Sequence, residues 1–204
     1  SKALGEYIVT VNNDTEVITP EWIEELLMFA QRSDVGMVGG RLYYRDGTLW
    51  NSGLALDSNR SVTLLHNKIA GNSSGYYGRA VVVQCFSALA GACLMFKRDL
   101  YQQIGGMDDV LFKVAHNDID FGLKIIQRGL CLVYTPFCEM YHYESKSRGS
   151  DLEGENLKRF LVEDYCLLAK WKDYLQYGDP FYNVNLSLKT PNFEVKTEKI
   201  QYRY

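Results

Sequence analysis

The chain has 204 residues, of which 47% are hydrophobic, and its 22 Lys and Arg residues against 25 Asp and Glu residues give a formal net charge of -3. This length and hydrophobic share predict one domain with a single sizeable core. The charges are mixed and form no basic block that could neutralise a phosphate backbone, which excludes nucleic acid as an expected partner.

The first part of the chain alternates between strand and helix patterns. The elements predicted there are a buried strand at 7–11, a helix at 20–32, and strands at 35–43 and 49–56. The polar cluster 12–15 closes the first strand, and Thr19 with Pro20 supplies the cap and the first position of the helix. Such alternation is typical of an α/β sheet.

The middle of the chain opens with a stretch that has no readable secondary structure. Residues 57–78 are rich in Ser, Asn and Gly, which predicts a long loop. The elements predicted after it are a strand at 81–85, a strand at 93–96, a short helix that ends at Gly105 and Gly106, a helix at 117–128 and a strand at 131–134. These elements continue the α/β pattern.

The last part of the chain predicts one amphipathic helix and a tail. The helix is expected at 154–175, and the residues of its apolar face are Leu157, Leu161, Leu168, Trp171 and Leu175. The tail from Gly178 onward mixes Pro, Asn and aromatic residues. It is expected to lie along the surface of the domain.

The cysteines and the hydropathy pattern indicate a cellular compartment. The 5 cysteines are odd in number and have no CxxC spacing, which predicts buried, reduced thiols in the cytoplasm. They are Cys85, Cys93, Cys131, Cys138 and Cys166. No apolar run approaches the roughly 20 residues that cross a bilayer, so no span is expected, while peripheral contact with a membrane stays open.

Three polar clusters could carry chemistry, and the first follows the opening strand. Asn12, Asn13 and Asp14 lie where open α/β sheets place their ligands. A carboxylate there could reach a hard divalent cation through oxygen. The same residue types also form Asx turns for local hydrogen-bonding reasons, so the motif alone leaves both interpretations open.

The second cluster occupies the first turn of the helix predicted at 117–128. It consists of Asn117, Asp118 and Asp120. The positive end of the helix dipole stabilises ionised carboxylates at this position. Helix capping would account for the same pair of aspartates, so spacing alone does not make either of them a catalytic base.

The third cluster lies within 141–149 and combines an imidazole with two cations. His142 could ligate a metal through a neutral ring nitrogen, and Lys146 and Arg148 could neutralise a diphosphate. The alternative is an exposed basic loop with a stacked histidine. Neither interpretation is excluded by this segment taken alone.

The order of the three clusters along the chain resembles the family 2 glycosyltransferases of the GT-A superfamily. The resemblance covers about residues 3–150, and each motif is common alone while the ordered set is specific. The motifs are Gly5-Glu6-Tyr7, Asn12 to Val17, Thr19-Pro20-Glu21-Trp22, Gly91-Ala92-Cys93-Leu94, Gly105-Gly106-Met107-Asp108, Asn117 to Phe121 and Tyr141 to Ser145. Bacterial enzymes of cell-surface polysaccharide assembly, including rhamnosyltransferase-like members, are the most similar, and residues 178–183 share that likeness.

The resemblance implies a role for each matching residue. Asn12, Asn13 and Asp14 match the DxD motif that meets a metal and the donor diphosphate, with Asn12 in place of the more frequent first Asp. Asp118 falls at the position of the general base, and His142 at that of an additional metal ligand. An amide oxygen coordinates more weakly than a carboxylate, so Asn12 makes tight metal binding unexpected.

The remaining matches imply supporting roles. The residues expected to contact the acceptor or to support the base are Gly91, Asn117 and Asp120. Lys146 and Arg148 are expected to contact the phosphates. The implied cofactor is Mg²⁺ or Mn²⁺.

The resemblance also implies a fold and a domain organisation. The fold would be a partial GT-A fold of the α/β class, with a mixed sheet flanked by helices and a C-terminal helical extension. Residues 1–150 would form the metal- and acceptor-binding portion, and residues 151–204 a helix and tail packed on it. The βα units that grip a nucleotide have no counterpart in this sequence, so weak or absent activity is expected of the isolated chain.

The implied function is metal-assisted transfer of a sugar, with inversion, from a nucleotide-diphosphate donor to a saccharide or lipid-linked acceptor. The reaction would serve cell-surface polysaccharide synthesis, in the cytoplasm or at the inner face of the membrane. A second hypothesis is a non-catalytic sugar-binding or scaffold module of the same fold. The sequence leaves the sugar, the nucleotide, the acceptor and the oligomeric state open.

Overall fold

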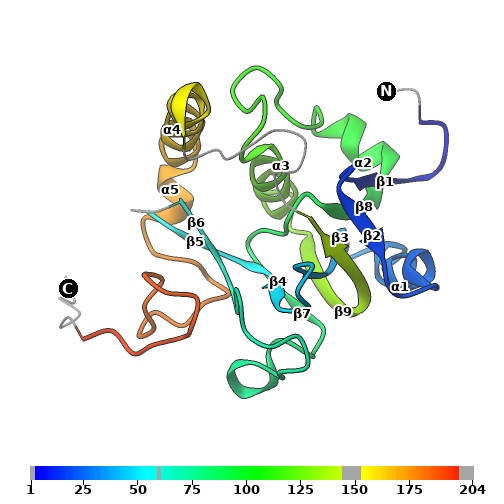
Figure 1. The fold of residues 1–204 in the computed structure, drawn as a ribbon. Helices are drawn as coiled ribbons and strands as arrows, with labels where there is room; N and C mark the ends of the chain where they lie inside the picture. The colour runs from blue at the N-terminus through cyan, green and yellow to red at the C-terminus, as the bar shows by residue number, and fades with distance from the viewer. Residues whose placement is uncertain (1–2, 59–60, 144–152, 198–204) are drawn as a thin grey trace.

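The computed structural model describes residues 3–58, 61–143 and 153–197 (Figure 1). The strands are β1 (Tyr7–Val11), β2 (Thr15–Val17), β3 (Val35–Tyr43), β4 (Leu49–Asn51), β5 (Leu54–Asp57), β6 (Ser61–Leu64), β7 (Gln84–Cys85), β8 (Cys93–Lys97) and β9 (Cys131–His142). The helices are α1 (Trp22–Ala30), α2 (Arg98–Gln103), α3 (Asn117–Ile126), α4 (Gly154–Lys170) and α5 (Lys172–Leu175), with a 3-10 turn η1 (Tyr76–Gly78).

The centre of the fold is one mixed sheet. Its strand order in the described residues is β1-β8-β3-β9-β2, with β4 paired to β3 and β7 paired to β9. The central strands β3 and β9 run parallel, while the other pairs of this sheet are antiparallel. The mixed sheet with helices confirms the predicted α/β class.

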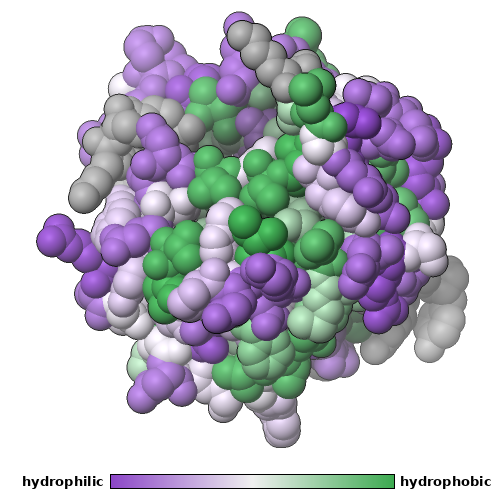
Figure 2. Space-filling model, turned by 90° about the vertical axis from the view of Figure 1, so that its right-hand side faces the viewer, coloured by the Kyte–Doolittle hydropathy of each residue, from purple (hydrophilic) through white to green (hydrophobic). Residues whose placement is uncertain are grey.

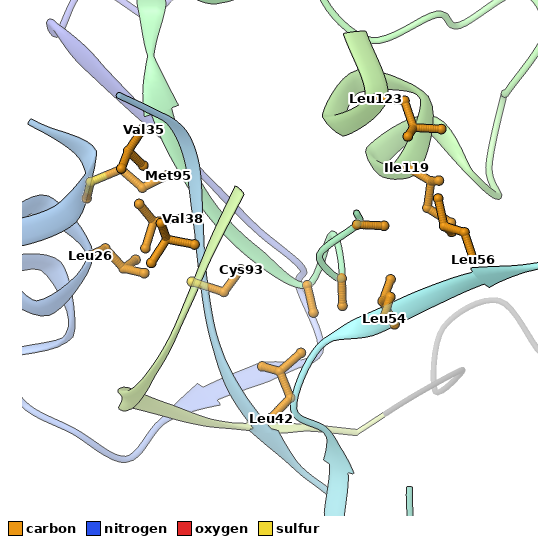
Figure 3. Close-up of a cluster of buried hydrophobic side chains, with 14 of the residues drawn as sticks. Leu26, Val35, Val38, Leu42, Leu54, Leu56, Cys93, Met95, Ile119 and Leu123 are labelled. Carbon is orange, nitrogen blue, oxygen red and sulfur yellow. The ribbon is translucent and has the colours of Figure 1, made fainter. Parts of the chain in front are cut away.

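Helices cover the sheet on both faces. A Cβ placed on Gly122 of α3 would lie 3.3 Å from the end of Met37, whereas the next residue, Val38, packs with Leu26 of α1 in one cluster. Successive residues of a strand point to opposite faces, so α1 and α3 lie on opposite sides of β3. Figure 3 shows the second of these contacts, with Leu26 beside Val38 and Met95.

The strand predicted at 49–56 is divided in the structure. Gly53 has a φ of 113°, which breaks the strand into β4 and β5 because such a value suits glycine. β5 pairs antiparallel with β6 in a separate two-stranded sheet. The prediction of a structureless loop at 57–78 is therefore wrong, since β6 and η1 lie within it.

The opening strand β1 was predicted to be buried and is only partly so. It stands at one end of the strand order, and Val11 is 45% exposed. Figure 2 views the side of the molecule that carries β1, β2 and α1, and it shows apolar side chains among polar ones. The exposed apolar residues of these elements are Val11, Val17, Ile23 and Met28.

The strand predicted at 131–134 continues to His142 as β9. Pro136 suggests a strand end because proline cannot donate to the ladder. In β9 this residue falls where the register with β3 shifts, between the Tyr134 and Glu139 pairings, so its missing N–H interrupts no regular pair. His142 consequently ends a strand and is not part of a polar loop.

Other predicted boundaries shift by a few residues. The predicted strand 81–85 is reduced to Gln84–Cys85, and the helices predicted at 20–32 and 117–128 are shorter at their ends. Thr19 does not cap α1, because the helix begins at Trp22 with Glu21 at the cap position. The Thr19 hydroxyl instead accepts a hydrogen bond from the Glu139 N–H at 3.1 Å. All the cysteines are free thiols, but only Cys93 and Cys138 are buried, which corrects the expectation of five buried thiols.

The C-terminal helix differs from the prediction in two ways: it is interrupted, and a different face is buried. Trp171 separates α4 from α5. Leu161, predicted to face the core, is 56% exposed. The buried residues of this segment are Glu163, Leu167, Trp171 and Leu175, so the inward face is rotated from the predicted one. Figure 1 shows α4 and α5 beside the β5–β6 hairpin.

The tail after α5 was expected on the surface and instead contributes to the core. The tail residues that are buried are Asp179, Tyr182, Leu186 and Phe193. The three apolar ones belong to a cluster that includes Leu65 and Phe86. In the described part of the chain, no helix is both long and apolar enough to cross a membrane.

Candidate active site

The first and third clusters meet at one end of the sheet. β2 pairs antiparallel with the end of β9, which places Thr15 opposite His142. The Tyr143 N–H donates to the Asp14 carbonyl at 2.8 Å, and the Thr15 hydroxyl donates to the Asn12 carbonyl at 2.8 Å. Residues 12–15 therefore form a turn closed by hydrogen bonds to the Asn12 carbonyl, and this turn brings Asp14 to His142.

Side chains of this turn converge on the His142 ring. Its Nε2 atom is 3.4 Å from Asp14 Oδ1 and 3.4 Å from the Asn12 side-chain amide nitrogen. The Trp50 ring packs against the imidazole edge-on, with ring centroids 4.7 Å apart. His142 is buried while Asp14 is partly exposed, so the pair faces the surface through the carboxylate. Asn13 is exposed.

These residues fit a divalent cation as an incomplete ligand set. Ligands about 2.1 Å from an octahedral ion lie about 3 Å apart, close to the 3.4 Å between Asp14 Oδ1 and His142 Nε2. No group of three or more His, Cys, Asp or Glu side chains suited to a metal occurs in the residues that the structure describes. Asp14 and His142 could hold an ion whose other ligands come from elsewhere, such as phosphate oxygens.

Asp118 is held by backbone N–H groups at the start of α3. Its Oδ2 accepts a hydrogen bond from Gly91 at 2.6 Å, and its Oδ1 accepts one from Ile119 at 2.9 Å. Burial raises the pKa of the Asp118 carboxyl, and the two backbone hydrogen bonds oppose part of that rise. One oxygen accepts from a different segment of the chain, so the hydrogen bonds of Asp118 extend beyond local helix capping.

Gly91 permits this contact because it has no side chain. A Cβ at this position would lie 2.9 Å from Asp118 Oδ2 and 3.2 Å from Asp118 Cβ. The next residue, Ala92, accepts a hydrogen bond from the Asn12 N–H at 3.0 Å. Residues 91 and 92 therefore connect the Asp14 turn to Asp118 through two hydrogen bonds.

Asp120 points into the protein. It is fully buried, and its carboxylate accepts from the Trp171 indole at 2.9 Å and pairs with Lys124 at 2.9 Å and Lys170 at 2.8 Å. Asn117 donates to the Val114 carbonyl at 3.3 Å. The structure thus ties both residues to the surroundings of α3, and any support they give to a site passes through that helix.

Two predicted phosphate contacts lie outside the described residues. Lys146 and Arg148 belong to the segment 144–152. The structure therefore brings together Asn12, Asp14 and His142, and links them to Gly91 and Asp118.

A cavity of about 470 Å³ lies elsewhere, between β6 and the tail. Its lining residues are Val62, Thr63, Leu64, Asn67, Leu188, Lys189, Thr190 and Pro191. None of them is a predicted site residue.

Sequence reasoning missed the residues that surround these groups. Trp50 carries no signal in the sequence, because its contact with His142 depends on how β3, which pairs with both β4 and β9, places these two strands. His116 directly precedes the second cluster and could have been noticed there. Glu163 and Asp164 lie on a helix distant in sequence, and a carboxylate on a helix normally indicates a solvated face.

Comparison with known proteins finds one matching family model and several similar proteins. A family model described as "Glycosyl transferase family group 2" matches residues 7–171. The uncharacterized protein y4gI of Sinorhizobium fredii is 36% identical over 199 residues, which is 98% of this chain and 22% of that protein. The O-antigen biosynthesis protein RfbC of Myxococcus xanthus is 32% identical over 190 residues, 92% of this chain and 14% of RfbC.

Two further comparisons are more limited. An N-acetylglucosaminyl-diphospho-decaprenol L-rhamnosyltransferase of Mycobacterium tuberculosis is 35% identical over 63 residues, 31% of this chain and 20% of that enzyme. A crystal structure of GalNAc-T7 with UDP, GalNAc and Mn²⁺ superposes with a TM-score of 0.58 at 15% identity, over 85% of this chain and 35% of that chain. That likeness shows the GT-A fold alone. The chain spans about a fifth or less of the length of these curated relatives.

Proposed function

Since this chain belongs to the family 2 group of glycosyltransferases, we propose that it transfers a sugar from a nucleoside diphosphate donor to a saccharide or lipid-linked acceptor with inversion at the anomeric carbon. The observation that carries the proposal is the hydrogen-bonded link between the pair Asp14 and His142, proposed to hold the metal, and Asp118, the proposed base. Asp14 and His142, which we assign to the donor, lie together, and Asp118 is linked to the Asp14 turn through residues 91 and 92.

Asp118 is the proposed general base. Inverting transfer is a single displacement, in which an acceptor oxygen attacks the anomeric carbon while the bond from that carbon to the diphosphate oxygen breaks. The attacking hydroxyl must lose its proton, and one carboxylate suffices to take it. A carboxyl whose pKa is raised by burial binds that proton more readily than an ordinary aspartate.

The diphosphate leaves as an anion, so it is stabilised by nearby positive charge and needs no general acid to protonate it. Asp14 and His142 would hold Mg²⁺ or Mn²⁺, which when bound neutralises charge that develops on the leaving group. We assign Lys146 and Arg148 to the same phosphates, by the match of their segment to the family. The GalNAc-T7 structure contains UDP and Mn²⁺, which supports the choice of donor and cation for this chain.

The relatives indicate an acceptor class and a place of action. RfbC acts in O-antigen biosynthesis, and the rhamnosyltransferase is named for a diphospho-decaprenol acceptor. We therefore assign this chain to surface polysaccharide synthesis at the inner face of the cell membrane, with residues 1–150 as the part that binds metal and acceptor and residues 151–204 as a helix and tail packed on it.

The test is a transfer assay on the intact protein. It is incubated with Mn²⁺ and a panel of UDP-, GDP- and dTDP-sugars, with lipid-linked saccharides as acceptors, and released nucleoside diphosphate and glycosylated product are measured. We expect an inverted product with one donor class and its loss in Asp118→Asn. Donor or saccharide binding without any product in the wild-type protein would instead support the non-catalytic module.

A further inference from the structure

The segment before Asp118 is tied to helix α4. It joins α2 to α3 and includes residues 108–116, none of which lies in a helix or strand. Asp108 pairs with Lys170 at 3.3 Å, and Phe112 lies under the same lysine, whose Nζ is 5.4 Å from the ring centroid. The segment that leads to Asp118 therefore packs against α4, a helix that is distant in the chain.

His116 adopts an unusual backbone conformation two residues before Asp118. Its φ is 65°, in the left-handed region that residues with a Cβ rarely occupy. The side chain is buried, with Nε2 at 3.2 Å from Asp164 Oδ1 and the ring 5.3 Å from that of Phe160. Left-handed residues persist where their surroundings hold them, and both of these contacts come from α4.

Glu163 holds the neighbouring residue. Its carboxylate is 3% exposed and accepts a hydrogen bond from the Ala115 N–H, while Arg159 Nε lies 3.7 Å from its other oxygen. A buried carboxylate is costly unless it is paired and hydrogen-bonded. Here it is paired with a backbone donor directly before the left-handed turn, so its position is coupled to the path of that turn.

The anchors on α4 and at its C-terminal end lie on both sides of Asp118 in sequence. Glu163 and Asp164 hold residues 115 and 116, and Asp120 is held by Lys170 and Trp171. Asp118 lies between these two anchored points, with its Oδ2 directed to Gly91.

We propose that Glu163 and Asp164 are positioning residues for Asp118: by fixing the left-handed turn at Ala115 and His116, they aim its carboxylate at Gly91 and the acceptor. The inference rests on the proposed function for its catalytic consequence, but its structural part stands without it. A displacement of about 1 Å in a reacting group can cost about 100-fold in rate, so small movements of this turn matter.

The structural test needs no substrate. The Gly91 amide reports the position of Asp118, because that carboxylate is its hydrogen-bond acceptor. Hydrogen exchange of this amide is measured by NMR in Asp164→Ala and Glu163→Ala, with Asp118→Ala as the reference for full loss. The Val38 amide, in the central strand β3, monitors global opening.

We expect both alanine variants to lose at least tenfold of the protection at Gly91 while Val38 keeps its protection. Asp164→Asn and Glu163→Gln should restore most of it, because an amide oxygen can still approach His116 Nε2 and can still accept from the Ala115 N–H. Asp164 is 22% exposed, so its alanine variant should fold even if Glu163→Ala does not. The proposal is overturned if Asp118→Ala loses protection at Gly91 while Asp164→Ala keeps it, and Glu163→Ala, where it folds, keeps it as well.

The kinetic test separates this inference from the proposed function. In the intact enzyme we expect Asp164→Ala to lower kcat about tenfold at an unchanged KM for the donor, with rescue in Asp164→Asn. Glu155→Gln, an exposed carboxylate of the same helix, is the matched control and should behave as wild type. If Asp118→Asn keeps full activity the proposed function fails; if it is inactive while Asp164→Ala keeps kcat within twofold, the positioning role fails.

Discussion

The Gly91 N–H donates a hydrogen bond of 2.6 Å to the Oδ2 atom of Asp118, and this contact joins two motifs that lie 27 residues apart in the chain. It requires close approach of a backbone to a carboxylate, which a glycine allows. It also sets the direction of the group that we propose as the catalytic base, so the surroundings of this one bond can be tested separately from the chemistry.

Gly91→Ala should impair the site through contact with Asp118. The new Cβ would lie 2.9 Å from Oδ2, and Gly91 is not among the glycines with positive φ, so the backbone itself accepts alanine. We expect a loss of about 1–3 kcal/mol in unfolding free energy, typical of overpacking, and a fall in kcat of at least tenfold. Chemical denaturation and transfer kinetics measure the two effects.

The control for this variant is the double substitution. In an Asp118→Ala background the clashing carboxylate is absent, so adding Gly91→Ala should cost clearly less stability than it does in the wild type. Equal costs in both backgrounds would place the strain of Gly91→Ala somewhere other than Asp118.

Divalent cation binding should be weak in the absence of a nucleotide. Asp14 and His142 offer two ligands, and Asn12 offers an amide where a carboxylate is more frequent in the family. Calorimetry should show Mn²⁺ binding that tightens when a nucleoside diphosphate is added and weakens at least tenfold in Asp14→Ala and in His142→Ala. Asp99→Asn, a surface carboxylate, is the control. Tight binding that survives Asp14→Ala would identify another ligand set.

Asp120 should behave as a stabilising residue, in contrast to Asp118. Its carboxylate is fully buried between Lys124, Lys170 and the Trp171 indole. Asp120→Ala leaves both lysines without this partner and should cost about 3 kcal/mol, near the low end for broken buried pairs because both lysines reach solvent. Urea denaturation measures the loss. A variant of wild-type stability would show that the ion pairs contribute little.

The sheet could be anticipated where strands carry uniform apolar runs. β3 and β8 are buried along most of their length, and the runs at 35–43 and 93–96 predict them almost to the residue. Only the first strand of the β5–β6 hairpin could be anticipated, because Leu54 to Leu56 lie in the run predicted at 49–56. β6 is a short Ser-Val-Thr-Leu segment whose cover comes from the tail, and nothing local marks it as a strand. The tail itself reads as surface, since its buried side chains, from Asp179 to Phe193, are widely spaced.

The candidate site likewise has a part that the sequence predicts and a part that it does not. Asn12 to Asp14, Asp118 and His142 lie at the ends of strands or at the start of a helix, and such positions can be recognised locally. Their connection cannot, because it depends on Gly91 reaching across to α3. Glu163 was hidden for the opposite reason: it is a buried carboxylate on a helix, where a charged side chain normally indicates the solvent face.

The pH dependence of stability should report the Asp118 carboxyl. Burial raises its pKa, so the folded protein binds this proton more tightly than the unfolded chain, whose value is near 3.8. The contribution of Asp118 to stability therefore declines as pH rises from the unfolded pKa through the raised folded pKa, and stays low above it. Thermal unfolding from about pH 3.5 to about pH 8 should show Asp118→Asn gaining stability relative to wild type across that window. A difference between the two proteins that is independent of pH would mean that the pKa is not raised.

Asp118→Asn should separate catalysis from folding at neutral pH. The amide can accept from either the Gly91 or the Ile119 N–H but not from both, which costs about 1 kcal/mol, while the buried charge is removed, so the melting temperature should stay within a few degrees of wild type. Donor affinity should be nearly intact, because Asp14 and His142 are untouched, and transfer should fall by about 100-fold or more, the range of general base catalysis. A merely structural Asp118 predicts the reverse, a clear loss of stability with near-normal turnover in the folded fraction. If turnover persists above about a tenth of wild type, less than the smallest effect typical of a general base, the assignment of Asp118 is wrong.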